Sequence, residues 1–157
     1  MTPHIPPSDF LLPAGVHPRI DAFYSLWLEK CQGDLPASFQ FDLEVLSVNY
    51  PLLARIGMDT SGKALLWLDV ATDAFWPFKT PVKDRPVVQS VPVPSIKRVI
   101  GALQLTLTSG IPDYHETTSW SHGGTTVSLA RIAVPVKGEQ GPELIAYWEV
   151  LEPKDFV

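Results

Sequence analysis

The chain has 157 residues, of which 45% are apolar and 18% are charged, and its formal net charge is -5. This composition is typical of one globular domain and excludes intrinsic disorder, which combines low hydrophobicity with high charge. The 12 basic residues are spread along the chain without forming a basic stripe, so we expect no nucleic-acid partner.

Residues 1–17 contain four prolines and are expected to form an extended arm, because proline fixes φ and lacks an amide hydrogen. Phe10, Leu11 and Leu12 are candidate anchors for this arm. The first residues lack the basic region of a secretory signal, and no apolar run reaches the ~20 residues of a membrane span. Cys31 is the single cysteine and cannot form an internal disulfide. We therefore expect a cytoplasmic protein without a membrane partner.

The strongest local pattern begins at Pro18, because proline is favoured at the first position of a helix. Apolar residues then recur at spacings of three and four, which predicts an amphipathic helix that stops at Gly33. The stripe consists of Ile20, Phe23, Trp27, Leu28 and Cys31. This helix is also the predicted contact of a homodimer, through Phe23, Tyr24 and Trp27. The alternative is that it only packs on the sheet.

The middle of the chain contains a predicted β-hairpin followed by a proline-rich connector. The segment after Pro36 fits either a short strand or a helical turn. Residues 52–59 and 63–72 are strand-like, and the small polar connection between them is typical of a hairpin. Residues 73–95 contain five prolines, which excludes a central strand or a long helix. We expect an ordered loop there, with a helical turn around residues 75–78.

A second helix is predicted over residues 96–109, with Ser95 as its N-cap and Gly110 at its end. In the middle strand of the three that follow, the apolar positions change phase near Arg131, which indicates a bulge or a strand that is apolar on both faces. The predicted strands are 113–121, 125–136 and 143–152. The whole pattern predicts an α+β domain over residues 18–152, with a tail at 153–157. It has one antiparallel sheet of about five strands and helices on one face.

Two strands, a long connector with short helical turns, one regular helix and a three-stranded meander are the element order of a PAS domain. Five segments resemble motifs of a bacterial, alphaproteobacterial-type PAS-like family that was formerly a domain of unknown function: residues 23–28, 33–36, 41–44, 50–53 and 130–135. The resemblance implies a non-catalytic sensory or protein-interaction module, often dimeric. Because the chain has no effector domain, its signal would pass to a separate partner protein.

The same resemblance allows two common PAS cofactors to be considered. Haem-binding members often use a histidine on the main helix, and residues 96–109 contain none. Photoactive flavin versions need a cysteine between the hairpin and the main helix, and residues 73–95 contain none. Both cofactors are therefore disfavoured. A non-covalent apolar or aromatic ligand is compatible with the sequence, and no cofactor is assigned.

Aromatic residues on the sheet and the connector indicate where a small molecule would bind, between the sheet and the main helix. The alternative is that these residues simply fill the core. Arg131 lies within an apolar strand and needs either a carboxylate such as Glu116 or an anionic ligand. The candidate ligand-binding residues are Trp67, Phe75, Trp76, Tyr114, Trp120, Arg131 and Trp148.

Catalytic and metal-binding patterns are weaker, and we assign no residue to either role. His115 and Glu116 are adjacent on a strand and point to opposite faces, which disfavours a metal site. Residues 119–122 lack the strand–turn–helix context of a nucleophilic serine. Strand-end carboxylates such as Glu149 are expected to be solvated. The alternative functions are a small cone-shaped α+β enzyme using Asp69, His115 and Glu116 for acid–base chemistry, and a ligand-free structural adaptor.

Overall fold

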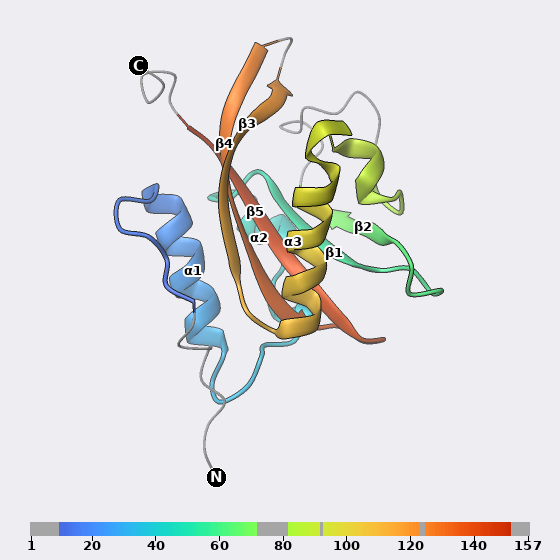
Figure 1. Cartoon of the computed structure of the whole chain (residues 1–157). Helices are drawn as coiled ribbons and strands as arrows, with labels where there is room; N and C mark the ends of the chain where they lie inside the picture. Colours follow the sequence, from blue (N-terminus) through green and yellow to red (C-terminus); the bar gives the residue numbers. More distant parts are fainter. Residues whose placement is uncertain (1–9, 72–81, 92, 123–124, 152–157) are drawn as a thin grey trace.

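Five antiparallel strands form a single sheet in the order β2-β1-β5-β4-β3 (Figure 1). The computed structural model describes residues 10–71, 82–91, 93–122 and 125–151, with the side chains of all of these except 117–122 and 125–127. The strands are β1 (Leu53–Met58), β2 (Leu65–Val70), β3 (Asp113–His122), β4 (Thr125–Lys137) and β5 (Pro142–Val150). The predicted hairpin and meander are therefore confirmed, and the fold class is α+β.

Helices and short helical turns connect and cover the strands. In the described part of the chain they are α1 (Pro18–Lys30), α2 (Leu43–Leu46), α3 (Ile96–Ser109) and the 3-10 helices η1 (Ser38–Gln40), η3 (Val87–Ser90) and η4 (Val93–Ser95). The segment after Pro36, which fitted either structure, is helical. The helical turn predicted at residues 75–78 lies outside the described residues. Within those residues, no helix combines the length and apolar character that crossing a membrane requires.

Helix α1 forms as its sequence predicts and is attached to the sheet by its apolar stripe. His17 caps it, because its Nδ1 accepts a hydrogen bond from the Arg19 amide at 3.1 Å. Phe23 and Trp27 are fully buried. The Trp27 indole Nε1 also donates to the carbonyl oxygen of Pro135 on β4 at 2.9 Å. The C-terminal half of α1 is thus held to the sheet by both apolar packing and a buried hydrogen bond.

The residues predicted to form a dimer all have partners within the chain. Phe23 and Trp27 lie in the core, and the half-buried Tyr24 stacks on Trp27 with ring centroids 5.8 Å apart. Phe10, one of the expected anchors of the arm, lies against Tyr24 with centroids 5.4 Å apart. The aromatic stripe therefore packs the arm and α1 onto the protomer, and the dimer contact stays a prediction.

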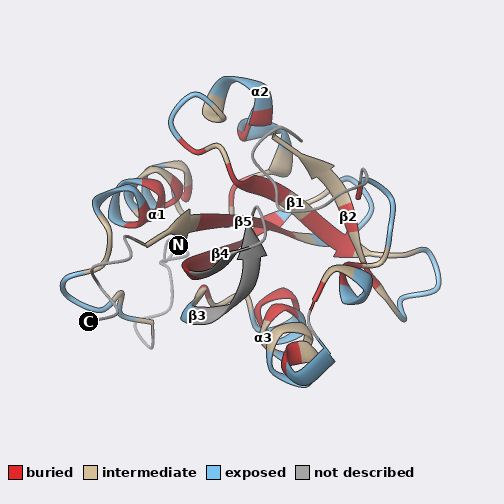
Figure 2. Ribbon diagram, turned by 90° about the horizontal axis from the view of Figure 1, so that it is seen from above, coloured by how far each residue is buried: buried red, intermediate tan, exposed pale blue. Residues whose placement is uncertain are grey.

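Helices cover both faces of the sheet, not one as predicted. Figure 2 shows α1 and α2 on one side and α3 on the other. Residues 128–136 of β4 are buried without interruption, and its pairing with β5 is continuous through Arg131. The apolar phase change near Arg131 therefore marks a strand buried on both faces. The α3-side core includes Trp67, Leu103, Leu129, Ala133 and Trp148. The α1-side core includes Phe23, Trp27, Ile132, Ile145 and Tyr147.

Helix α3 begins and ends at the predicted residues, and Ser95 lies at its N-cap position as predicted. Gly110 ends the helix with φ of 71°, in the left-handed region that glycine enters without strain. The Ser95 side chain makes no capping hydrogen bond to the helix. Its Oγ instead accepts from Arg98 Nη2 at 3.2 Å. The Arg98 guanidinium, one turn into the helix, therefore donates to the Ser95 hydroxyl oxygen in place of the N-terminal amides of α3.

Candidate functional site

A partly buried polar cluster lies on the α3 side of the sheet, where β3 and β4 pair. Arg131 on β4 is 4% exposed, and its Nη2 donates to Asp113 Oδ2 on β3 at 3.0 Å. His115 lies directly opposite Arg131 in the strand register. Its Nδ1 is 2.9 Å from the same Asp113 oxygen and 3.4 Å from Arg131 Nη2. One carboxylate therefore holds both a guanidinium and an imidazole.

The carboxylate that pairs with Arg131 is not the predicted one. Side chains alternate between faces along a strand, so Asp113 and His115 share the Arg131 face, whereas Tyr114 and Glu116 face α1. The Tyr114 hydroxyl donates to Glu116 Oε2 at 2.8 Å on that opposite face. Glu116 is therefore separated from Arg131 by the sheet itself.

Among the described residues, both polar contacts of the Arg131 side chain are made by Nη2, and its buried Nε has no acceptor there. Leaving a buried donor unpaired costs about 1–3 kcal/mol, so native proteins rarely do so.

Two of the predicted aromatic residues adjoin this cluster. Trp148 on β5 is directly opposite Arg131 in the register and faces the same side. The Trp67 ring on β2 lies with its centroid 5.7 Å from that of Trp148. The Trp67 indole Nε1 donates to Ser90 Oγ in η3 at 3.1 Å. An apolar, aromatic wall and a guanidinium are thus side by side under α3 and the connector.

The remaining predicted ligand-binding residues do not join this group. Tyr114 faces the α1 side, where it packs against the other core. Phe75 and Trp76 lie outside the described residues. Trp120 pairs with Val127 in the β3–β4 ladder, and its side chain is also outside the described part of the chain. Asp113 and His115 were not predicted to act with Arg131, although their spacing of two on one strand places them on the same face.

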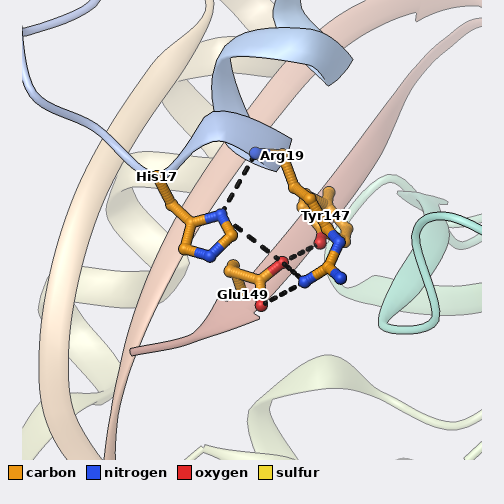
Figure 3. A network of polar contacts seen from close by, with 4 residues as sticks. All are labelled: His17, Arg19, Tyr147 and Glu149. Atoms are coloured by element: carbon orange, nitrogen blue, oxygen red, sulfur yellow. Dashed lines mark hydrogen bonds and ion pairs between the residues drawn. The ribbon is translucent and has the colours of Figure 1, made fainter. Parts of the chain in front are cut away.

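A second polar network lies on the α1 side, at the N-terminus of α1 (Figure 3). Glu149 on β5 accepts from Arg19 Nη1 at 3.4 and 3.5 Å, and its Oε1 lies 3.9 Å from His17 Nδ1. The hydroxyl of Tyr147 donates to the same carboxylate. Only 12% of the Glu149 side chain is exposed. The expectation that this carboxylate is solvated is therefore wrong, because the start of α1 covers it.

Stability is expected to fall at alkaline pH because buried acidic groups resist losing their protons. Burial, followed by the nearby Asp34, raises the pKa of Cys31 from 9.0 to about 11. Burial and the Glu149 carboxylate raise the pKa of Tyr147 above its ordinary 10.0. Raised pKa values contribute stability that is complete below the unfolded-state pKa and is lost as pH rises through the folded value. Urea midpoints should therefore decline from pH 9 to pH 11.

Two variants test this pH dependence. Cys31→Ala should remove the part of the decline that begins near the thiol's ordinary pKa of 9.0, and Tyr147→Phe the part that begins near 10.0. Urea midpoints that stay constant across this pH range in the wild-type protein would contradict the account.

An open groove of about 1300 Å³ lies away from the Arg131 cluster, around an ion pair in which Arg55 Nη1 is 2.9 Å from Glu143 Oε1. It exceeds the roughly 300–1,000 Å³ of ordinary ligand pockets. Of the predicted ligand-binding residues whose side chains the structure describes, Trp67, Tyr114, Arg131 and Trp148, none lines it. Asp69 does line it, on β2, which three strands separate from β3. The acid–base residues suggested for an enzyme, Asp69, His115 and Glu116, therefore do not converge. Among the described residues, no three histidine, cysteine or acidic side chains are grouped as metal ligands.

Comparisons with known proteins add little to this geometry. No family model matches the chain, and no curated protein matches it. Among solved structures, the chain is similar to a C-terminal domain from Streptococcus mutans, with 14% identity and a TM-score of 0.39. That likeness covers 66% of this chain and 79% of the other. At this level it carries no argument about fold family or function.

Proposed function

We propose that the protein is a non-catalytic, PAS-like sensory module that binds a small molecule between the sheet and α3. Ligand binding changes the position of α1, and a separate partner protein recognises that change. The observed order of a hairpin, a connector with 3-10 helices, α3 and a three-stranded meander supports the PAS-like part of this proposal. The polar cluster and the Trp67–Trp148 pair support the α3-side layer as the ligand site.

The alternation of side chains along β5 is the observation that carries the proposal. Trp148 faces the α3-side core, whereas its neighbours Tyr147 and Glu149 face α1. Glu149 contacts Arg19 near the N-terminus of α1, and Tyr147 packs on Phe23 and donates to Glu149. A displacement of Trp148 must therefore move backbone that also positions the α1 network. A ligand shifts a conformational equilibrium only by binding one state better. A ligand on the α3 side can therefore change the position of α1 only through an element that contacts both layers, and β5 is such an element.

The two ends of α1 are held with different strength. At its C-terminal half, Trp27 is fully buried and hydrogen-bonded to β4. At its N-terminus, Arg19 is 56% exposed and contacts Glu149 at no less than 3.4 Å. Exposed ion pairs contribute little, typically about 0–1 kcal/mol. We infer that the N-terminal turn of α1 moves on signalling while the Trp27 end stays attached.

Native mass spectrometry of protein purified from its own host, followed by denaturing mass analysis, tests this function. The proposal predicts a native mass above that of the chain or its dimer, with a small molecule released on denaturation. The native spectrum also reports whether the chain is a monomer or the predicted homodimer. A bare mass at every protein concentration would contradict ligand sensing and favour a ligand-free structural adaptor.

A further inference from the structure

We infer that the open groove around Arg55 and Glu143 binds a basic, amphipathic segment of a partner protein. This site goes beyond the proposed function, because it lies away from the Arg131 cluster and its occupation requires no ligand there. The floor of the groove is formed by β1 and β2, and its sides by the segment before β1 and by the turns at residues 59–62 and 139–142. The groove continues around the end of the sheet to the last turns of α3.

The floor of the groove is the α1-side face of β1 and β2. Ile56 belongs to the α3-side core, so the alternation of side chains along β1 places Arg55 and Gly57 on the other face. A Cβ atom on Gly57 would lie 2.8 Å from Leu68 Cδ1 and 3.3 Å from Glu143 Cγ. Because Gly57 has no side chain, Leu68 and Glu143 can close over β1 and form one continuous floor.

One side of the groove carries exposed apolar side chains. Phe39 in η1 lines the groove and is 85% exposed. Val45 in α2 and Val48 just after it are also exposed, so residues 39–48 carry three of the eight large apolar side chains that are exposed in the described part of the chain. Such a gathering is typical of a surface that binds another protein. The volume of about 1300 Å³ also suits a polypeptide segment better than a small molecule.

The charge of the groove selects a basic partner. Among the described residues that line it, five are acidic and one, Arg55, is basic. Arg55 pairs with Glu143, and the other four carboxylates take part in none of the ion pairs of the described chain. These four are Asp42, Asp59, Asp69 and Glu139.

The four carboxylates lie on four different segments: before α2, in the β1–β2 turn, on β2 and in the β4–β5 turn. They are therefore placed to contact basic side chains along the length of a bound segment, and complementary charge of this kind favours association. A second copy of the chain is a poor occupant, because each copy has a net charge of -5 and the two repel.

The segment binds across the face of the sheet and not as an added strand. At the outer edge of β2, the Trp67 amide donates to the Arg85 carbonyl at 3.0 Å, and the Asp84 amide donates to the Trp67 carbonyl at 2.6 Å. A partner strand would have to displace these bonds to pair there. Apolar side chains of the partner therefore lie on Phe39 and Leu68 and basic ones on the carboxylates, as when an amphipathic helix docks in a groove.

Three peptides of equal length test this chemistry. The first carries leucine at helical spacing and lysine elsewhere, the second has glutamate in place of lysine, and the third has serine in place of leucine. Each is titrated into the full, ¹⁵N-labelled chain and followed by NMR. We expect the leucine–lysine peptide to shift the amides of residues 55–62 and 139–143 and to bind more weakly as salt rises. The serine peptide should bind about tenfold more weakly, and the glutamate peptide should not bind.

Two pairs of variants separate the groove from the rest of the acidic surface. Phe39→Ser should weaken binding of the leucine–lysine peptide about tenfold, whereas Leu105→Ser, which removes an exposed apolar side chain outside the groove, should leave it unchanged. Glu139→Lys should also weaken it about tenfold. Glu29→Lys makes the same change of net charge on the exposed face of α1 and should have less than about a twofold effect. All four side chains are exposed, so these variants are expected to fold.

Three results would overturn the inference. Equal losses in Glu139→Lys and Glu29→Lys would mean that the peptide responds to net charge alone. Spermine that shifts the same amides and binds as tightly as the peptide would assign the groove to a small polycation. Dimerisation that increases with protein concentration and is abolished by Phe39→Ser would assign the groove to a second copy of the chain.

Discussion

Replacing Trp27 with alanine is expected to lower the free energy of unfolding by about 3–5 kcal/mol, the range found for truncating a large buried aromatic side chain. Trp27 is fully buried between α1 and the sheet, and its indole donates to the Pro135 carbonyl at 2.9 Å. Alanine removes both the packing and the donor. Urea unfolding monitored by circular dichroism measures the loss.

Two control variants separate the causes. Trp27→Phe keeps much of the ring volume but leaves the Pro135 carbonyl without its donor, and should cost about 1–3 kcal/mol. Leu28→Ala changes the next residue, which is 38% exposed, and should cost under about 1 kcal/mol. A Trp27→Ala variant as stable as Leu28→Ala would show that α1 is not attached to the sheet through this side chain.

Replacing Arg131 with methionine is expected to cost about 1–3 kcal/mol, because it removes the buried guanidinium from a partly buried ion pair and leaves the Asp113 carboxylate without its charged partner. Asp113 would keep only the His115 contact, and its side chain is 20% exposed. Methionine fills much of the arginine volume, so most of the loss is electrostatic. Chemical denaturation again provides the measurement.

The double variant Arg131→Met with Asp113→Asn tests whether the loss comes from the pair. Removing both charges leaves no unpaired buried ion, so the double variant should be more stable than Arg131→Met alone. In a double-mutant cycle the two effects should be clearly non-additive. Strictly additive losses would mean that Arg131 and Asp113 contribute independently, and that the buried cluster is not a unit.

Local patterns were sufficient for most elements of the fold. The spacing of three and four over residues 20–31 predicts α1, and proline and glycine residues predict where the strands and α3 end. These features depend on neighbours along the chain. The covering of both faces of the sheet by helices does not depend on such neighbours. A strand buried on both faces has an apolar run of residues whichever helices cover it. Residues 128–136 contain that run, but the neighbouring residues do not indicate which helix covers which face of the sheet.

The partner of Arg131 shows how one residue of register decides a site. In a regular hairpin closed by His122 and Thr125, Glu116 would lie opposite Arg131. The ladder instead shifts between Thr117 and Trp120, so that His115 takes that position. A shift of one residue moves every later side chain to the other face. Glu116 is therefore the reasonable choice from sequence, and the irregularity is what makes it wrong.

Glu149 was mispredicted for a different reason. Its position near the end of β5 indicates a solvated carboxylate, and the residues beside it in the sequence do not cover it. The cover comes from His17 and Arg19, some 130 positions earlier in the chain. Burial supplied by a distant helix has no local sequence pattern.

The central claim is that β5 couples the α3-side layer to α1, and hydrogen–deuterium exchange of residues 18–30 tests it most directly. Trp148→Phe and Trp67→Phe perturb the same buried aromatic pair in the same layer. Only Trp148 shares a strand with Tyr147 and Glu149.

The account predicts that Trp148→Phe speeds amide exchange in the N-terminal turn of α1 several-fold, whereas Trp67→Phe leaves that turn unchanged at equal global stability. Equal effects of the two variants on α1, or no effect of either, would contradict coupling through β5 and leave α1 as a purely structural cover.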